Sequence, residues 1–223
     1  FENGNFTSSA QALKDFISKV EPGRLISQDY LYLGRAQMKD TTMFTEGLAN
    51  ITKAVEMDST NAAVMSEIGQ ALFKGKKYEA AAKAYEISIK NPERALLDYY
   101  YLGSSYYFNY GALKNANLNP EKDLLVKADS AFAYLLQRAP TTQIAWQYRG
   151  RINRLMDDEN DSQGLAVPFY SKYIELVTVE KPELAAKSAP GLIEAYNYLG
   201  SVAARKDGDN VKAKEFFDKV LAL

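Results

Sequence analysis

Apolar residues fall along almost the whole chain in runs that suit helices with one buried face. No stretch alternates apolar and polar residues in the way that a half-buried strand does. The pattern therefore predicts an all-α fold.

A short motif recurs at five places along this helical pattern. In each, a large residue precedes Gly and lies three positions after an aromatic residue or Met; the five pairs are Leu33-Gly34, Ile68-Gly69, Leu102-Gly103, Arg149-Gly150 and Leu199-Gly200. Further along, a small residue stands four positions before a large one, at Gly47/Ile51, Ala81/Tyr85, Ala128/Phe132, Ala166/Tyr170 and Ala213/Phe217. Because Gly inside a helix costs about 1 kcal/mol relative to Ala, we expect these glycines to allow a close helix–helix approach.

The spacing between successive motifs is constant over the first four. Gly69 follows Gly47 by 22 residues, and the same 22 residues separate Ala81 from Gly103 and Ala128 from Gly150. Since one residue turns the buried face of a helix by about 100°, each second helix is predicted to pack on the next first helix in one fixed register. The spacing within a unit is longer in the third and fourth, which predicts insertions in their turns, including one at 109–119.

These residues follow the pattern W-x2-L-G-x2-Y…A-x3-F, and the chain resembles an array of tetratricopeptide repeats (TPRs) over nearly its full length. The resemblance implies a right-handed α-solenoid of helical hairpins. The expected repeats cover about 25–60, 61–91, 92–140, 141–181 and 182–223, after an incomplete repeat at 1–24. Because the chain begins without Met and with half a repeat, we expect it to be a piece of a longer protein.

Residues 95–223 further resemble a subgroup of exported TPR proteins of Gram-negative bacteria. The resemblance is carried by Trp146, Arg149, Arg151, Asn153 and the segment 162–170. It implies a periplasmic or otherwise extracytoplasmic location, with the cytoplasm as the alternative.

Composition narrows the chemistry. The net charge of −1 and the dispersed basic residues argue against binding to nucleic acid, and no apolar run approaches the roughly 20 residues of a membrane span. The absence of His and Cys excludes a Cys nucleophile, a His base and nearly every zinc site. No phosphate-binding loop or serine-nucleophile motif is present, so we expect neither enzymatic activity nor a cofactor.

An acidic segment, Asp157 to Ser162, partly imitates a calcium-binding loop. Ser162 and Pro168 stand where that loop needs Gly and Glu, so the sequence predicts a solvated turn. Arg149 occupies a core-facing position nearby, and we expect it to be buried and bonded to a carboxylate or carbonyl, with the acidic turn as the candidate partner.

TPR arrays bind segments of other proteins on the face lined by their first helices, and the register of the repeats predicts which residues line this face. The candidate peptide-binding residues are Arg35, Gln70, Phe73, Tyr100, Tyr107, Gln147, Arg151, Arg154 and Asn197. Tyr100 and Tyr107, with the two arginines of the fourth repeat, suit an extended peptide that carries an acidic or polar side chain. In the alternative, both tyrosines pack against the adjoining helix or the 109–119 insertion.

The leading hypothesis is a non-catalytic scaffold that binds a peptide segment of another protein. The alternative is the ligand-sensing region of a larger receptor or regulator. Leu31 and Arg35 replace the Lys and Asn with which chaperone-binding TPRs hold a carboxylate, so that role is not expected. Apolar residues at the two ends, such as Phe16 and Phe217, predict self-association or cover by further helices.

Overall fold

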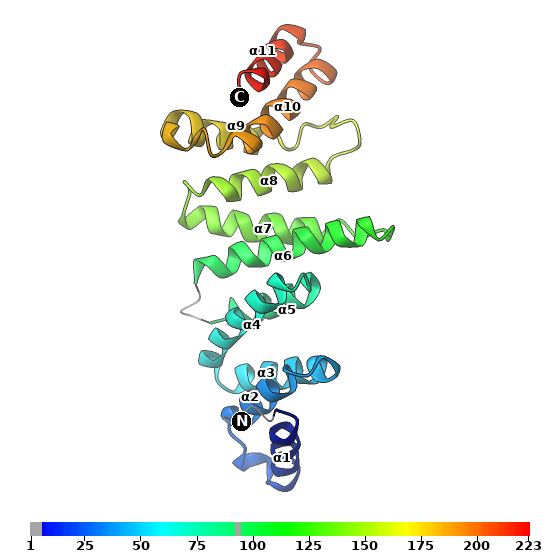
Figure 1. Ribbon diagram of the computed structural model, residues 1–223, viewed down its shortest axis with the longest axis vertical. Coiled ribbons are helices and arrows are strands. Elements are labelled where there is room, and N and C mark those ends of the chain that lie inside the picture. The colour runs from blue at the N-terminus through cyan, green and yellow to red at the C-terminus, as the bar shows by residue number, and fades with distance from the viewer. Residues whose placement is uncertain (1–5, 92–94) are drawn as a thin grey trace. The chain divides into compact units, whose positions relative to one another are not determined.

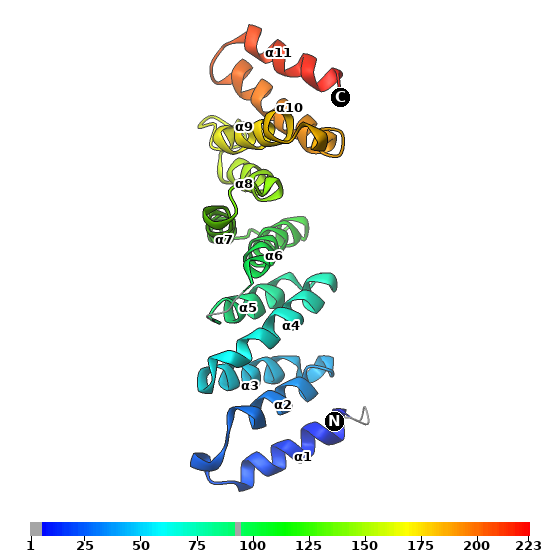
Figure 2. The same ribbon diagram turned by 90° about the vertical axis from the view of Figure 1, so that its left-hand side faces the viewer.

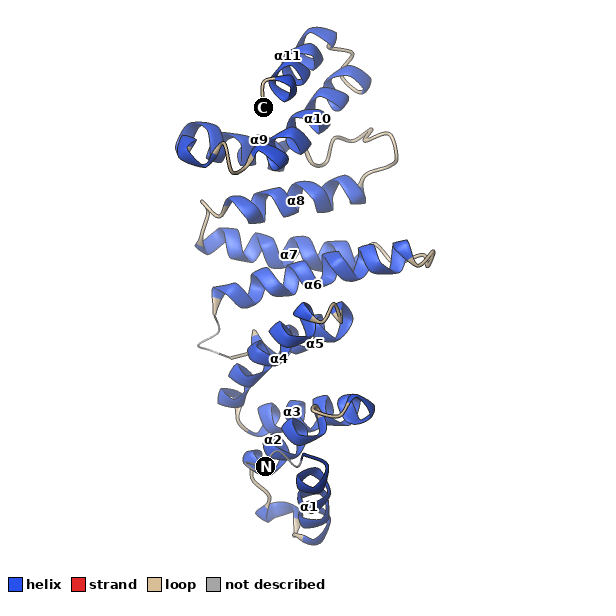
Figure 3. Ribbon diagram, in the orientation of Figure 1, coloured by secondary structure: helices blue, strands red, loops and turns tan. Residues whose placement is uncertain are grey.

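The structure is a computed structural model that describes residues 6–91 and 95–223. These residues form helices joined by loops and contain no strand (Figure 3). The predicted all-α class is confirmed. No helix among these residues combines the length and the apolar character that crossing a membrane requires.

The chain divides into two compact units, Phe1–Asp98 and Tyr99–Leu223. In the first unit a single helix is followed by two hairpins, α2 with α3 and α4 with α5. The two helices of each hairpin lie side by side in both ribbon views (Figures 1 and 2). The helices are α1 (Phe6–Lys19), α2 (Ser27–Gln37), α3 (Phe44–Met57), α4 (Ala63–Lys74) and α5 (Tyr78–Ser88). Short 3-10 turns at Pro22–Arg24, Thr41–Met43 and Ser59–Ala62 connect them.

The second unit consists of three further hairpins, α6 with α7, α8 with α9, and α10 with α11 (Figure 1). The helices are α6 (Leu96–Asn115), α7 (Asp123–Arg138), α8 (Gln143–Met156), α9 (Val167–Glu175), α10 (Ala189–Arg205) and α11 (Asn210–Leu221). A π-helical turn, η4 (Leu176–Glu180), and a 3-10 turn, η5 (Pro182–Leu184), lie between α9 and α10 and take up the longer spacing before the last motif.

The start of α6 belongs to the first unit through Asp98, which is buried. Its carboxylate accepts hydrogen bonds from the hydroxyl groups of Ser66 at 2.6 Å and Ser88 at 2.7 Å. Because a buried carboxylate without partners is very costly, these two bonds stabilise Asp98 against α4 and α5 within the first unit.

The motif glycines face the large residue of the second helix in their own hairpin. A Cβ atom placed on Gly69 would lie 2.8 Å from the Tyr85 ring, and one on Gly103 would lie 2.8 Å from the Phe132 ring. Gly34 meets Ile51, Gly150 meets Tyr170 and Gly200 meets Phe217 in the same way. The predicted close approach is therefore confirmed: a ring, or the branched side chain of Ile51, lies against each of these glycines, and even a methyl group there would collide.

The aromatic residues that precede the glycines also pack within their own hairpins. Tyr99 stacks on Tyr134 with ring centroids 3.9 Å apart, and Tyr196 lies 6.2 Å from Phe216. The indole of Trp146 is half-buried and donates a hydrogen bond of 2.7 Å to the carbonyl of Pro140. The ring pairs join the two helices of their hairpins, as does the contact of Trp146 with Phe169 on α9, 6.4 Å away. The bond to Pro140 holds Trp146 to the loop before α8.

The insertion at 109–119 was predicted to lie in the turn of the third repeat, and this prediction was wrong because most of the insertion is helical. Residues 109–115 are the last turns of α6, and only the residues between Asn115 and Asp123 connect the helices. Tyr110 is buried and Leu113 is half-buried, so the apolar face of α6 continues through the insertion. In the fourth repeat the predicted insertion is a turn, between Met156 and Val167.

Candidate functional site

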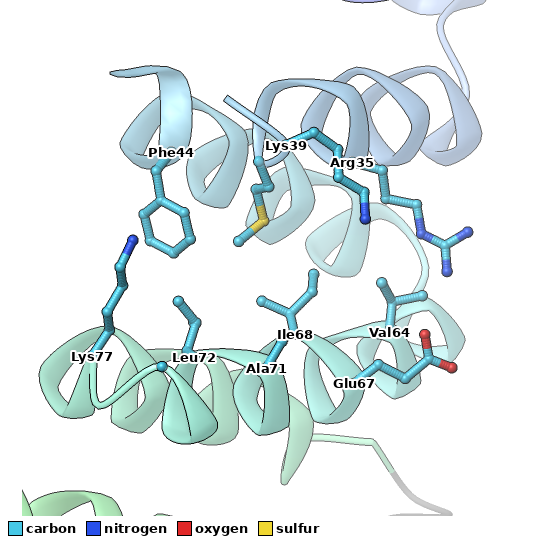
Figure 4. Close-up of a pocket in the computed structure, with 11 residues that line it drawn as sticks. Arg35, Lys39, Phe44, Val64, Glu67, Ile68, Ala71, Leu72 and Lys77 are labelled. Carbon is cyan, nitrogen blue, oxygen red and sulfur yellow. The ribbon is translucent and has the colours of Figure 1, made fainter. Parts of the chain in front are cut away.

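A groove in the first unit lies between two successive first helices, α2 and α4 (Figure 4). Its volume is about 690 Å³, and it is open to solvent. The lining residues are Arg35, Met38, Lys39, Phe44, Val64, Glu67, Ile68, Ala71, Leu72, Gly75 and Lys77. We call this feature the α2–α4 groove.

The floor of the α2–α4 groove is apolar because it is the outer edge of the core of this unit. Phe44 lies on one side and Val64, Ile68 and Leu72 lie on the other (Figure 4), and Met38 also lines the groove. Leu72 is buried in the core, and the other four are half-buried and pack against it. Side chains that are only partly covered by their own fold offer apolar area that a partner can bury.

The rim of the α2–α4 groove carries more positive than negative charge. Arg35, Lys39 and Lys77 line it together with one carboxylate, Glu67. Within residues 6–91 and 95–223 none of the four forms an ion pair. The ammonium group of Lys77 lies 5.7 Å from the centroid of the Phe44 ring, close enough for a cation–π interaction.

Of the candidate residues in the first unit, the structure places Arg35 in the α2–α4 groove and the other two outside it. Phe73 packs edge-on against Tyr78, with ring centroids 5.6 Å apart. Gln70 is half-buried on α4 and does not line the groove.

In the second unit, the candidate Arg151 is bound to a carboxylate of its own chain. Its Nη2 lies 2.6 Å from Oε2 of Glu194, and its Nε lies 2.9 Å from Oε1. Glu194 also accepts hydrogen bonds from the Tyr170 hydroxyl at 2.6 Å and from Gln147 Nε2 at 3.2 Å. The positive charge of Arg151 is therefore offset by the carboxylate of Glu194.

This network shifts the pKa values of its members in directions that reinforce it. Burial raises the pKa of Glu194, but the hydrogen bonds from Arg151 and Tyr170 outweigh burial, and the net pKa lies below its usual value. Burial and the neighbouring Glu194 carboxylate raise the pKa of the Tyr170 hydroxyl. These shifts keep the Glu194 carboxylate ionised and keep the Tyr170 hydroxyl protonated, so that it can donate its hydrogen bond.

Tyr100 and Tyr107 lie on one side of α6, as expected from their spacing, and both contact the ring of Tyr148. Their ring centroids lie 6.1 Å and 5.4 Å from that of Tyr148, in edge-on arrangements. Tyr148 is buried and stacks on Phe132 at 5.0 Å. Packing against the adjoining helix, the alternative considered for these tyrosines, is therefore present, although both rings remain only half-buried.

Gln147 and Arg151 line a smaller cavity of about 320 Å³ beside the start of α10. Its wall also includes Tyr173, Lys187 and Gly191. A side chain at position 191 would collide with the Tyr173 hydroxyl and the Gln147 amide. Glycine at this position therefore leaves room for both groups. The remaining candidates lie elsewhere: Asn197 is exposed, and Arg154 is 3.8 Å from the carboxylate of Asp161.

Arg149 is largely buried and bonded to a carboxylate, as predicted, but the predicted partner was wrong. Its Nε and Nη2 donate to the two oxygens of Asp129 on α7, at 2.8 Å and 2.7 Å, and Asn153 donates to the same carboxylate at 2.9 Å. In the acidic turn, the carboxylate of Asp157 pairs with the backbone of the turn itself. It accepts hydrogen bonds from the amides of residues 158, 163 and 165. No group of acidic residues that could hold a metal ion is found among the described residues.

Comparison with solved structures identifies the fold. Over 100% of its length the chain is similar to the crystal structure of the C-terminal part of a TPR repeat-containing protein from Cytophaga hutchinsonii, of which 78% is covered, with a TM-score of 0.61 and 28% sequence identity. The fold is that of a TPR-like α-solenoid. No protein-family model matches the chain, and neither does any curated protein.

The TPR-like register found some of the residues that line these sites and missed others. Val64, Ile68 and Lys77 of the α2–α4 groove were missed because the register selected other positions on α4, Gln70 and Phe73, which do not line the groove. The same register places Glu194 of the fifth repeat on the predicted binding face, together with Arg151 of the fourth. Their opposite charges on successive repeats were the signal that could have predicted the pair.

Proposed function

We propose that this protein is a non-catalytic scaffold that binds a peptide segment of another protein. TPR-like folds are generally protein–protein interaction scaffolds and typically have no catalytic role. The observation that supports a peptide partner here is the α2–α4 groove, with its half-buried apolar floor.

The proposal is tested by filling the groove. Ala71 is exposed and lines the groove, so Ala71→Trp occupies the space without disturbing the core. Ala63→Trp on the same helix is the matched control, because Ala63 is exposed and lies outside the groove lining. Peptides are selected from a random phage-displayed library on the wild-type protein, and their affinities are measured by fluorescence anisotropy.

We expect Ala71→Trp to weaken binding of the selected peptides at least about tenfold, with Ala63→Trp and the melting temperature unchanged. The reverse pattern, with only Ala63→Trp impaired, would move the site out of the groove to the surface around the start of α4. A library that yields no peptide sensitive to either variant would contradict the proposal.

The second candidate function is the sensing of a small ligand, and one observation supports it. The cavity beside α10 is lined by polar side chains, including Gln147, Arg151 and Tyr173. Thermal-shift screening with small polar metabolites tests this alternative. A stabilising compound whose effect Gly191→Ala removes would favour it, since the added methyl group displaces Tyr173 and Gln147.

A further inference from the structure

We propose that the α2–α4 groove selects an acidic segment, in which one large apolar side chain is flanked on both sides by Asp or Glu. This inference rests on the proposed function and adds the chemistry of the partner. The predicted partner segment carries negative charge on both sides of its apolar anchor.

The apolar anchor follows from the shape and lining of the floor. Phe44 on one wall faces Ile68 and Leu72 on the other (Figure 4), and Met38 also lines the groove. All but Leu72 are half-buried, so a side chain placed between the walls would remove apolar surface from water on both of its faces.

The flanking acidic residues follow from the charges on the rim. In Figure 4, Lys77 lies beside Phe44 at one end of the groove, and Arg35 lies at the other end, near Val64. Lys39 lies on the wall that carries Arg35. Glu67 lies at the same end as Arg35, but Arg35 and Lys39 together outnumber it, so both ends keep a net positive charge. The apolar floor lies between the two ends, and this order of charges is complementary to an acidic–apolar–acidic segment.

The local charge differs from the charge of the whole chain. The chain has a net charge of −1, whereas the groove has three cations and a single carboxylate, Glu67. Since none of the three cations forms an ion pair with another described residue, none must break such a pair to meet a ligand. Arg151 in the second unit is different, because Glu194 already occupies its guanidinium group.

The test uses three short fluorescein-labelled peptides that differ only beside a central Leu. The flanking residues are Glu in the first peptide, Gln in the second and Lys in the third. Binding is measured by fluorescence anisotropy to the wild-type chain and to the triple variant Arg35→Glu, Lys39→Glu, Lys77→Glu.

A second triple variant, Lys14→Glu, Lys19→Glu, Lys90→Glu, is the matched control. These lysines are exposed, belong to the same unit and do not line the groove, and the net charge changes by the same amount. The melting temperature of each variant reports whether it is folded.

We expect the Glu-flanked peptide to bind the wild-type chain at least about tenfold more tightly than the Gln-flanked peptide, and less tightly as salt is added. The groove triple variant should lose this preference and favour the Lys-flanked peptide, and the control triple variant should keep it. If Ala71→Trp blocks all binding but the three peptides bind equally, the groove is a binding site and the inference about acidic partners is wrong. If the peptides bind with no sensitivity to Ala71→Trp, the proposed function itself fails at this groove.

Discussion

Arg151 on α8 and Glu194 on α10 form a salt bridge in which Nη2 and Oε2 are 2.6 Å apart, although 43 residues separate them in the chain. Both side chains are mostly covered, with 32% and 24% of their surfaces exposed. The pair joins the first helices of two successive hairpins, and Tyr170 adds the second helix of the earlier hairpin. A polar network therefore connects these two successive repeats, in addition to single hydrogen bonds such as the one from the Ala166 amide to the Tyr198 hydroxyl.

We predict that Glu194→Gln lowers the free energy of unfolding by about 1–3 kcal/mol at neutral pH, because it removes the charge that faces a partly buried guanidinium group. Thermal or denaturant unfolding of the two proteins measures the difference. Glu175→Gln is the control, since Glu175 is an exposed carboxylate on α9. An equal loss in both variants would show that the Arg151–Glu194 pair contributes nothing specific.

The same pair predicts a dependence on pH. The pKa of Glu194 lies below its usual value of 4.5, so the ionised carboxylate stabilises the folded state above that pH. This contribution is lost as the pH falls through the lowered pKa. The stability difference between wild type and Glu194→Gln should therefore be constant near neutral pH and shrink below about pH 4.5, and a difference that grows on acidification would contradict the assignment.

Two glycines of α6 provide a matched test of close packing. A methyl group at Gly103 would lie 2.8 Å from the Phe132 ring, whereas one at Gly111 would meet nothing within 4 Å. We expect Gly103→Ala to destabilise the fold and Gly103→Leu to cost about 1–3 kcal/mol or more, while Gly111→Ala stabilises it by up to about 1 kcal/mol. Unfolding in urea measures all three, and a stabilising Gly103→Ala would show that the ring can move away freely.

The fold was predictable from the sequence because its signal is repeated. Five glycines at matching positions and a constant spacing predicted the hairpins, and each glycine meets a ring or branched side chain of its own hairpin. The course of the 109–119 segment was not predictable from spacing alone. Extra residues can lengthen either a loop or a helix, and the apolar residues Tyr110 and Leu113 decided in favour of the helix.

The candidate sites were predictable only in part. The spacing of seven residues predicted that Tyr100 and Tyr107 lie on the same side of their helix, and both contact Tyr148. Pairing between helices depends on their relative rotation, which the register does not give. For this reason Arg149 was assigned to the acidic turn and is instead held by Asp129.

The acidic turn gives a prediction about metal ions. Asp157 already accepts three backbone hydrogen bonds, and Asp158 accepts from the amides of Asn160 and Ser162. Hydrogen bonds to the ionised form lower the pKa of Asp158, so its carboxylate needs no metal ion to remain charged. We expect calcium to raise the melting temperature no more than magnesium at the same concentration, and a clearly larger rise with calcium would contradict this.

The last prediction concerns the exposed apolar residues of α11. Leu221 is 86% exposed and Val211 is 73% exposed, and exposed apolar surface commonly marks a site of interaction. We predict that the chain self-associates weakly through this helix, because a neighbouring copy would remove that surface from water. Leu221→Glu should shift the chain towards monomer in sedimentation velocity at high protein concentration. Val179→Glu is the control, because Val179 is 72% exposed on η4, away from α11. A wild-type chain that stays monomeric at every concentration, or an equal shift in both variants, would exclude α11 as the contact.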